Sequence, residues 1–245
     1  MSSEKQFAAS HAAFWHALMP MAEEYLRTRN RMLTQYASPI SSALSRETRG
    51  VVNELGYRLY AGSLELGLHL SNLPEPFVAR SYESTMEYVD SLNESKSPVP
   101  TPPAKESIEE ALRVASNIAA FFRHAMVQTR FTIQTVGVAP SFPGCGWLDE
   151  SVGDFLTSNL LIEVKAGDRN FRSIDLRQVL IYCALNFASK AYDIAHVCFL
   201  NPRLGVFLGE PLERLCQEIS GRTAAELLEN IVQFVSDPTE TYIAG

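Results

Sequence analysis

The chain has 245 residues, of which 46% are hydrophobic and 20% charged, with a formal net charge of −7. This length buries a substantial core in one large domain or two smaller ones, and the acidic balance excludes indiscriminate binding of nucleic acid by the whole surface. No apolar run approaches the ~20 residues of a membrane span, and the N-terminus shows no secretory signal, so we expect a cytoplasmic protein without membrane contact.

The four cysteines are widely spaced, and no two of them form a Cys-x-x-Cys pair. A zinc site or an iron–sulfur cluster is therefore not expected. We interpret Cys183, Cys198 and Cys216 as reduced, buried thiols and expect Cys145, in a turn, near solvent.

Residues 1–94 are predicted to form an all-helical N-terminal domain with about four helices. Apolar residues recur at helical spacing from Phe14 to Leu26 and again from Val51 to Tyr60, while prolines and glycines punctuate the run. A further helix is expected over residues 77–92. The region contains no evident catalytic constellation, so we expect it to serve partner binding, self-association or substrate gating.

Residues 95–105 are predicted to be a Pro-rich linker. Four prolines fall between Ser95 and Pro103, and such a composition is typical of an extended, semi-rigid connector. The linker is the best domain boundary in the sequence.

Residues 106–245 are predicted to form the second domain, and the whole chain an α/β (α+β) fold. Ser107 and Glu110 are expected to form a capping box at the start of a helix. The expected elements are a helix over 107–125, a strand over 127–138, a β-hairpin over 153–167, a helix over 173–190, strands over 196–200 and 204–208, and two C-terminal helices over 211–235 separated by Gly221.

The hairpin carries three ionisable residues within otherwise apolar runs. Side chains alternate faces along a strand, so Glu163 and Lys165 project from the same side. A turn at Ser158 and Asn159 would place Asp154 opposite Glu163 on that side. Two carboxylates and one ammonium so close together are costly unless something compensates them. A divalent cation held by the two acids would provide the compensation.

This pattern resembles the core of the PD-(D/E)XK nuclease superfamily. The match consists of Asp154 on one strand, Glu163-Val164-Lys165 nine residues later, and a following helix that carries Gln178. Gly153 stands where many members have proline. The resemblance covers residues 106–209 and implies a restriction-endonuclease-like αβββαβ core, followed here by the C-terminal helices.

The resemblance also implies roles for these residues. Asp154, Glu163 and the backbone carbonyl of Val164 would bind Mg²⁺, with Mn²⁺ as a substitute. Lys165 would orient or deprotonate a water molecule, or stabilise negative charge in the transition state. Gln178 would orient the water or an oxygen ligand, and a surface amide is the alternative interpretation.

Two points about the site remain open in the sequence. Asp149 and Glu150 rival Asp154 for the first acidic position, although hairpin geometry favours Asp154. Three basic residues follow the acids: Arg169, Arg172 and Arg177. They either contact phosphate or are solvated side chains in a loop and at the start of a helix.

The function that the resemblance implies is a Mg²⁺-dependent endonuclease acting on DNA, in restriction or phage defence. One alternative is a catalytically inactive subunit that keeps the nuclease fold and binds other proteins. Another is an RNA-directed nuclease, because the expected site contacts phosphate rather than sugar.

Overall fold

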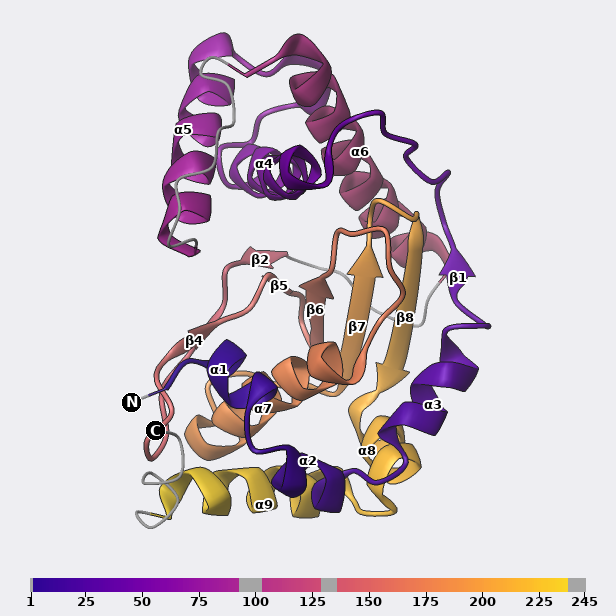
Figure 1. Cartoon of the computed structure of the whole chain (residues 1–245), viewed down its shortest axis with the longest axis vertical. Helices are drawn as coiled ribbons and strands as arrows, with labels where there is room; N and C mark the ends of the chain where they lie inside the picture. Colours follow the sequence, from indigo (N-terminus) through magenta and orange to yellow (C-terminus); the bar gives the residue numbers. More distant parts are fainter. Residues whose placement is uncertain (1, 93–102, 129–135, 238–245) are drawn as a thin grey trace.

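The computed structural model describes residues 2–92, 103–128 and 136–237. A six-stranded mixed sheet, with strand order β1-β8-β7-β6-β5-β2, lies between two helical layers (Figure 1). Strands β6 and β7 run parallel, and the other neighbouring pairs in this sheet are antiparallel. The predicted α+β class is confirmed.

The sheet is built around strand β6, whose residues Leu160 to Glu163 are all buried. Burial on both faces suits its nearly continuous apolar sequence. The strands of the main sheet are β1 (Thr34–Gln35), β2 (Gly137–Val138), β5 (Phe155–Leu156), β6 (Leu160–Val164), β7 (His196–Asn201) and β8 (Val206–Pro211), and β3 (Ser141–Phe142) pairs with β4 (Ser151–Val152) in a separate small sheet.

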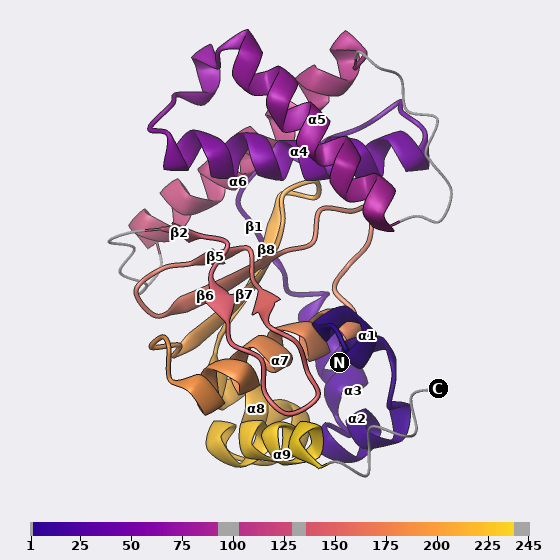
Figure 2. The ribbon, with the colours of Figure 1, turned by 90° about the vertical axis from the view of Figure 1, so that its left-hand side faces the viewer.

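One helical layer covers each face of the sheet (Figure 2). The first consists of α4 (Arg46–Glu65), α5 (Glu75–Leu92) and α6 (Lys105–Gln128), with a 3-10 turn at Leu70–Asn72. The second consists of α1 (Glu4–Ala9), α2 (Ala12–Leu18), α3 (Ala22–Arg29), α7 (Ser173–Ser189), α8 (Leu212–Ser220) and α9 (Ala224–Ser236). None of the helices in the described residues combines the length and apolar character needed to cross a bilayer.

Each layer shares a hydrophobic core with one face of β6. Ile162 belongs to the core under α4 and α6, and Leu161 belongs to the core against α7. Helices α4 and α6 approach closely because Gly56 has no side chain; an added Cβ would lie 2.6 Å from Cβ of Val114. The alternation along β6 therefore decides which side chains reach which helices.

The described residues on both sides of the predicted linker share these cores. Helix α4, from the first half, packs with α6 over the sheet, while α1 packs with α7 on the opposite face. Residues 95–102 lie outside the described residues. The expectation of an all-helical first half was wrong at Thr34–Gln35, which form an edge strand on β8; so short a strand has no detectable alternation.

Two predictions around α6 were wrong, one of them only in part. The strand expected over 127–138 overlaps the end of α6, which continues to Gln128; residues 129–135 lie outside the described residues, and only Gly137–Val138 form a strand. Helix α6 also begins at Lys105, before Ser107, so Glu110 is not part of a capping box. Glu110 is instead buried and bonds through Oε1 to Arg203 at 2.8 Å.

The elements after residue 150 follow the predictions closely. The hairpin, α7 and β7 lie where expected, and α8 and α9 are separated at Gly221, which ends α8 with a φ of 73°. Strand β8 begins two residues late because residues 202–205 form the turn before it. All four cysteines are free, and Cys145 alone among them is not fully buried.

The Arg203–Glu110 ion pair gives the first prediction. Replacing Glu110 with Ala leaves the buried Arg203 guanidinium without its carboxylate, and we expect the free energy of unfolding to fall by about 3–5 kcal/mol. Urea titration measures this loss. The control is Glu109→Ala on the exposed side of the same helix, which we expect to change stability by less than about 0.5 kcal/mol. Equal, small effects of both substitutions would contradict the assignment.

Candidate functional site

The hairpin register brings the two acids together. Phe155 pairs with Ile162 and Leu156 with Leu161, so the next position along places Asp154 opposite Glu163. Oδ2 of Asp154 accepts a hydrogen bond from the backbone N–H of Val164 at 2.6 Å. The predicted register is therefore confirmed, and the first acid is held against the strand that carries the second.

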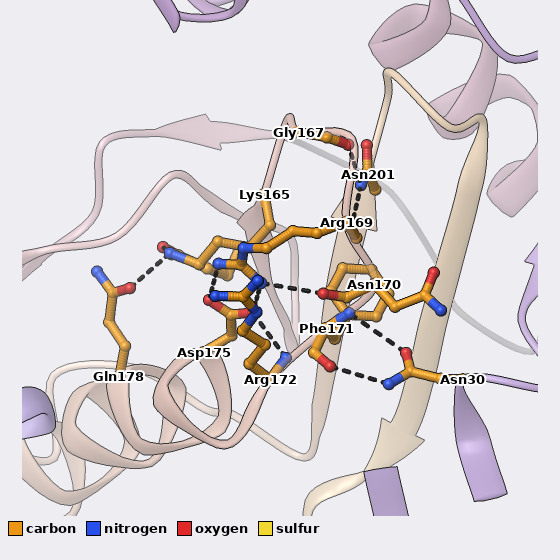
Figure 3. A network of polar contacts seen from close by, with 11 residues as sticks. Asn30, Lys165, Gly167, Arg169, Asn170, Phe171, Arg172, Asp175, Gln178 and Asn201 are labelled. Carbon is orange, nitrogen blue, oxygen red and sulfur yellow. Dashed lines mark hydrogen bonds and ion pairs between the residues drawn. The ribbon is translucent and has the colours of Figure 1, made fainter. Parts of the chain in front are cut away.

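A chain of polar contacts runs from Glu163 to helix α7. Nζ of Lys165 donates to Oε1 of Glu163 at 2.7 Å and to Oε1 of Gln178 at 2.5 Å, as Figure 3 shows for Lys165 and Gln178. Nε2 of Gln178 in turn donates to the hydroxyl of Tyr182 at 2.7 Å. Gln178 is buried, so its amide holds Lys165 rather than facing solvent as a surface amide.

The charges of this group do not balance. Burial, and next the negative charge of Glu163, raise the pKa of Asp154 well above its ordinary value. Burial acts to lower the pKa of Lys165, but its interactions with Glu163 and Asp154 outweigh burial and raise that pKa. Oε2 of Glu163 is buried without a hydrogen-bond partner. The site thus holds one ammonium, more than one carboxylate and an unused carboxylate oxygen.

Helix α4 forms the opposite wall of the site. A cavity of about 280 Å³ lies between α4 and the C-terminal end of β6. Asp154, Val164 and Lys165 line one side, and Glu54 and Tyr57 line the other. The Tyr57 hydroxyl donates to the backbone carbonyl of Asp154 at 3.3 Å, and the charge of Glu54 contributes to the raised pKa of Asp154.

Glu54 is a site residue that the sequence analysis missed. Four residues of α4 line the cavity at helical spacing: Gly50, Asn53, Glu54 and Tyr57. They form a continuous stripe between apolar positions such as Val51 and Leu55, which point into the core. This stripe was the available signal, but nothing local indicates which segment it faces.

Two contacts fix α4 to the loop that follows β6, and a third joins it to the β7–β8 turn. Nδ2 of Asn53 donates to the Ala166 carbonyl at 2.6 Å, and Arg49 pairs with Asp168 at 2.5 Å. Nε of Arg203 donates to Oδ1 of Asn53 at 2.8 Å. The buried Arg203 therefore anchors the helix above the site as well as the turn in which it lies.

Asn201 supports the same loop from β7. Its Nδ2 donates to the carbonyls of Gly167 and Arg169 at 2.9 and 3.1 Å (Figure 3). Its Oδ1 accepts from the backbone N–H groups of Arg203 and Leu204. A single buried amide thus connects the loop beside the cavity to the β7–β8 turn.

The three predicted phosphate-binding arginines have different surroundings. Arg169 lines the cavity and forms a two-point ion pair with Asp175, at 2.6 and 2.9 Å. Arg172 stands at the start of α7, where its backbone N–H donates to Asp175 (Figure 3). Arg177 donates to the Ala8 carbonyl and lies over the Trp15 ring. Among these three, Arg169 is the one that lines the cavity.

The rival acids lie elsewhere. The backbone N–H of Asp149 donates to the Ser2 carbonyl, and Oε1 of Glu150 accepts from the Ser141 hydroxyl at 2.5 Å. Neither residue lines the cavity. Geometry therefore favours Asp154 for the first acidic position.

The donor set suits a hard divalent cation. Carboxylate and carbonyl oxygens are the ligands that Mg²⁺ takes, and it keeps several waters beside one or two carboxylates. Within the described residues, no three His, Cys, Asp or Glu side chains are grouped closely enough to hold a metal ion. Asp154 and Glu163, with the unpartnered Oε2 of Glu163, nevertheless fit an ion that needs only two carboxylates.

No protein-family model matches the chain, and a search of curated proteins finds no match.

The raised pKa of Asp154 predicts a stability effect that depends on pH. Because this pKa is higher in the folded chain, the contribution of the group to the free energy of unfolding falls as pH rises through it. An asparagine at position 154 would keep an oxygen that accepts the hydrogen bond from the Val164 N–H, but it would carry no charge. In cation-free buffer we expect Asp154→Asn to stabilise the protein at about pH 8 by on the order of 1 kcal/mol, since one pKa unit corresponds to about 1.4 kcal/mol.

The gain should shrink as pH is lowered towards about 4, where the wild-type carboxyl group is protonated in the folded state. Urea unfolding of both proteins across this range measures the difference. A gain that does not change with pH would show that charge is not its cause.

Proposed function

We propose that this protein is a metal-dependent endonuclease that hydrolyses phosphodiester bonds in DNA. The observation that carries the proposal is the grouping of Asp154 and Glu163 with Lys165 at a cavity, with a buried carboxylate oxygen unused. The resemblance of these residues to the PD-(D/E)XK pattern supports it. So does the order of elements, in which a helix precedes the hairpin and α7 connects β6 to the parallel β7.

Asp154, Glu163 and the carbonyl of Val164 would hold the cation. When bound, Mg²⁺ supplies a Lewis acid that polarises the phosphoryl group and lowers the pKa of water. Because burial, and next the negative charge of Glu163, raise the pKa of Asp154, the ionised carboxylate is unfavourable without a cation. Cation binding therefore competes with protonation at this residue, and affinity for the ion falls as pH falls.

Lys165 is best suited to act as a cation. Its raised pKa keeps the ammonium protonated at neutral pH, which favours stabilising negative charge on the phosphoryl oxygens over removing a proton. Gln178 fixes the ammonium through its 2.5 Å contact, and Tyr182 fixes Gln178. In this arrangement Gln178 positions Lys165 and does not itself need to reach the substrate.

Glu54 adds a third carboxylate from outside the hairpin. It faces the cavity from α4 and pairs with Arg58 through Oε1 at 2.8 Å. We infer that Glu54 would support a bound cation from the opposite wall of the cavity without being one of its direct ligands. Such supporting contacts commonly account for 10- to 100-fold in metal affinity or activity.

The central prediction concerns the three hairpin residues. Asp154→Ala, Glu163→Ala and Lys165→Ala should each lower Mg²⁺-dependent cleavage by about 10²-fold or more, and EDTA should abolish cleavage by the wild type. The measurement is cleavage of linear, circular and single-stranded DNA with and without Mg²⁺, alongside circular dichroism to confirm folding. Asp149→Ala is the matched control, because Asp149 does not line the cavity.

Cleavage that survives all three substitutions would remove the assignment. The same variants separate a nuclease from an inactive binding subunit by calorimetry with Mg²⁺ or Mn²⁺. A nuclease should take up the ion in a way that depends on Glu163, and a binding subunit should not. RNA oligonucleotides assayed in parallel would identify an RNA-directed enzyme.

Glu54 allows a graded prediction. Glu54→Gln keeps the size of the side chain but removes its charge, and we expect about 10- to 100-fold weaker Mg²⁺ activation. The concentration of Mg²⁺ that gives half-maximal cleavage measures the effect. The control is Glu47→Gln near the start of the same helix, which does not line the cavity. Equal activation of both variants would exclude Glu54 from the site.

A further inference from the structure

We propose that Arg169 binds a phosphate group of the nucleic-acid substrate, and that Asp175 is a positioning residue that orients Arg169 for this contact. This inference rests on the proposed nuclease function and names a substrate-binding group of the same site. Three observations carry it. Arg169 lines the cavity, its backbone and its guanidinium are both held in place, and one edge of the guanidinium has no acceptor among the described residues.

The hydrogen bonds of Arg169 leave one pair of donors unused. Its Nη1 donates to Oδ2 of Asp175 at 2.6 Å and to the Asn170 carbonyl at 3.0 Å, and its Nη2 donates to Oδ1 of Asp175 at 2.9 Å. A guanidinium carries five N–H donors, so the Nε–H and the second N–H of Nη2 have no acceptor within the described residues. These two N–H groups lie parallel on one edge of the planar guanidinium, which is the geometry that binds two oxygens of a phosphate.

The position of Arg169 is fixed from two sides. Asp175 is buried at the start of α7, where it also accepts a hydrogen bond from the backbone N–H of Arg172 at 2.9 Å, and Figure 3 shows the Arg169 side chain reaching it. From β7, the buried Asn201 donates to the backbone carbonyl of Arg169 at 3.1 Å. A side chain that is already held loses less conformational entropy when it binds a ligand. The two-point ion pair therefore prepares Arg169 for binding.

The charges that line the cavity call for a cation at this place. Glu54 and Asp154 line the cavity, and as ionised groups they would repel a phosphate. Lys165 lines it too, but its ammonium already donates to Glu163 at 2.7 Å. Among the described residues that line the cavity, Arg169 is the other cation, and 36% of its side chain is exposed. A phosphate that enters the cavity can therefore reach it.

The first test measures binding of a labelled 20-base-pair DNA duplex with a single-stranded tail, by fluorescence anisotropy in Ca²⁺, which takes oxygen ligands as Mg²⁺ does. Arg169→Lys keeps a positive charge beside Asp175, but an ammonium lacks the two edges that hold a carboxylate and a phosphate at once. We expect this variant to bind the DNA about tenfold more weakly. The matched control is Arg172→Lys, outside the cavity, which should stay within about twofold of the wild type. Unchanged binding by Arg169→Lys overturns the inference.

The variant Asp175→Asn separates positioning from simple charge. Removing a negative charge would by itself strengthen the binding of an anion, whereas losing the two-point hold on Arg169 should weaken it about fivefold, the scale of one hydrogen bond. Asp168→Asn is the control, because it removes an exposed carboxylate from the same loop, and it should not weaken binding. Circular dichroism confirms that each variant is folded.

The same substitution in the Arg169→Lys background tests whether Asp175 acts through Arg169. We expect Asp175→Asn to cause no further loss of binding there, because the two residues act as one unit. Equal or stronger DNA binding by the single variant Asp175→Asn overturns the positioning role. An equal loss in both backgrounds overturns it as well, because Asp175 would then act independently of Arg169.

Cleavage of the same DNA in Mg²⁺ separates this inference from the nuclease assignment. Cleavage by the wild type, together with unchanged binding by Arg169→Lys, overturns the phosphate contact and leaves the nuclease assignment intact. Weaker binding by Arg169→Lys and Asp175→Asn, without cleavage by the wild type, supports the phosphate contact and removes the nuclease assignment. A wild type that neither binds nor cuts the DNA overturns both.

Discussion

The candidate site is defined by an imbalance of charge inside a small hairpin. Asp154 and Glu163 are held side by side by strand register, and a single ammonium, Lys165, is shared between Glu163 and Gln178. Packing alone would favour apolar residues at these positions, because buried charge is costly unless fully compensated. A raised pKa at Asp154 and an unpartnered oxygen on Glu163 are the signs of that cost. Strain of this kind is characteristic of functional sites.

The hairpin keeps these buried charges close together because its surroundings are rigid. Strand β6 is buried on both faces, and Asn201 ties its following loop to β7. Arg203 then joins that region to α4 through Asn53 and to α6 through Glu110. One buried arginine thus links the sheet to two helices of the covering layer, α4 and α6, and through Asn53 it holds α4 beside the site.

The sequence predicted what is local and missed what is long-range. The hairpin register follows from alternation over a few residues and a polar turn at Ser158 and Asn159, so it could be read directly. Glu54 could not, because it meets Asp154 only through the packing of α4 on α6 and the buried contacts of Arg203. The end of α6 was misjudged for a related reason: its last residues are compatible with strand or helix, and the choice depends on packing rather than local pattern.

The first half of the chain forms part of the candidate site. Under the proposed nuclease function, the acidic chain has little general attraction for nucleic acid, so binding would depend on the shape and charge close to the site. Helix α4 contributes one wall of the cavity with Glu54 and Tyr57. Helix α4, from the helical half, therefore forms part of the cavity itself, and the roles expected for that half, which are partner binding, self-association and substrate gating, stay predictions.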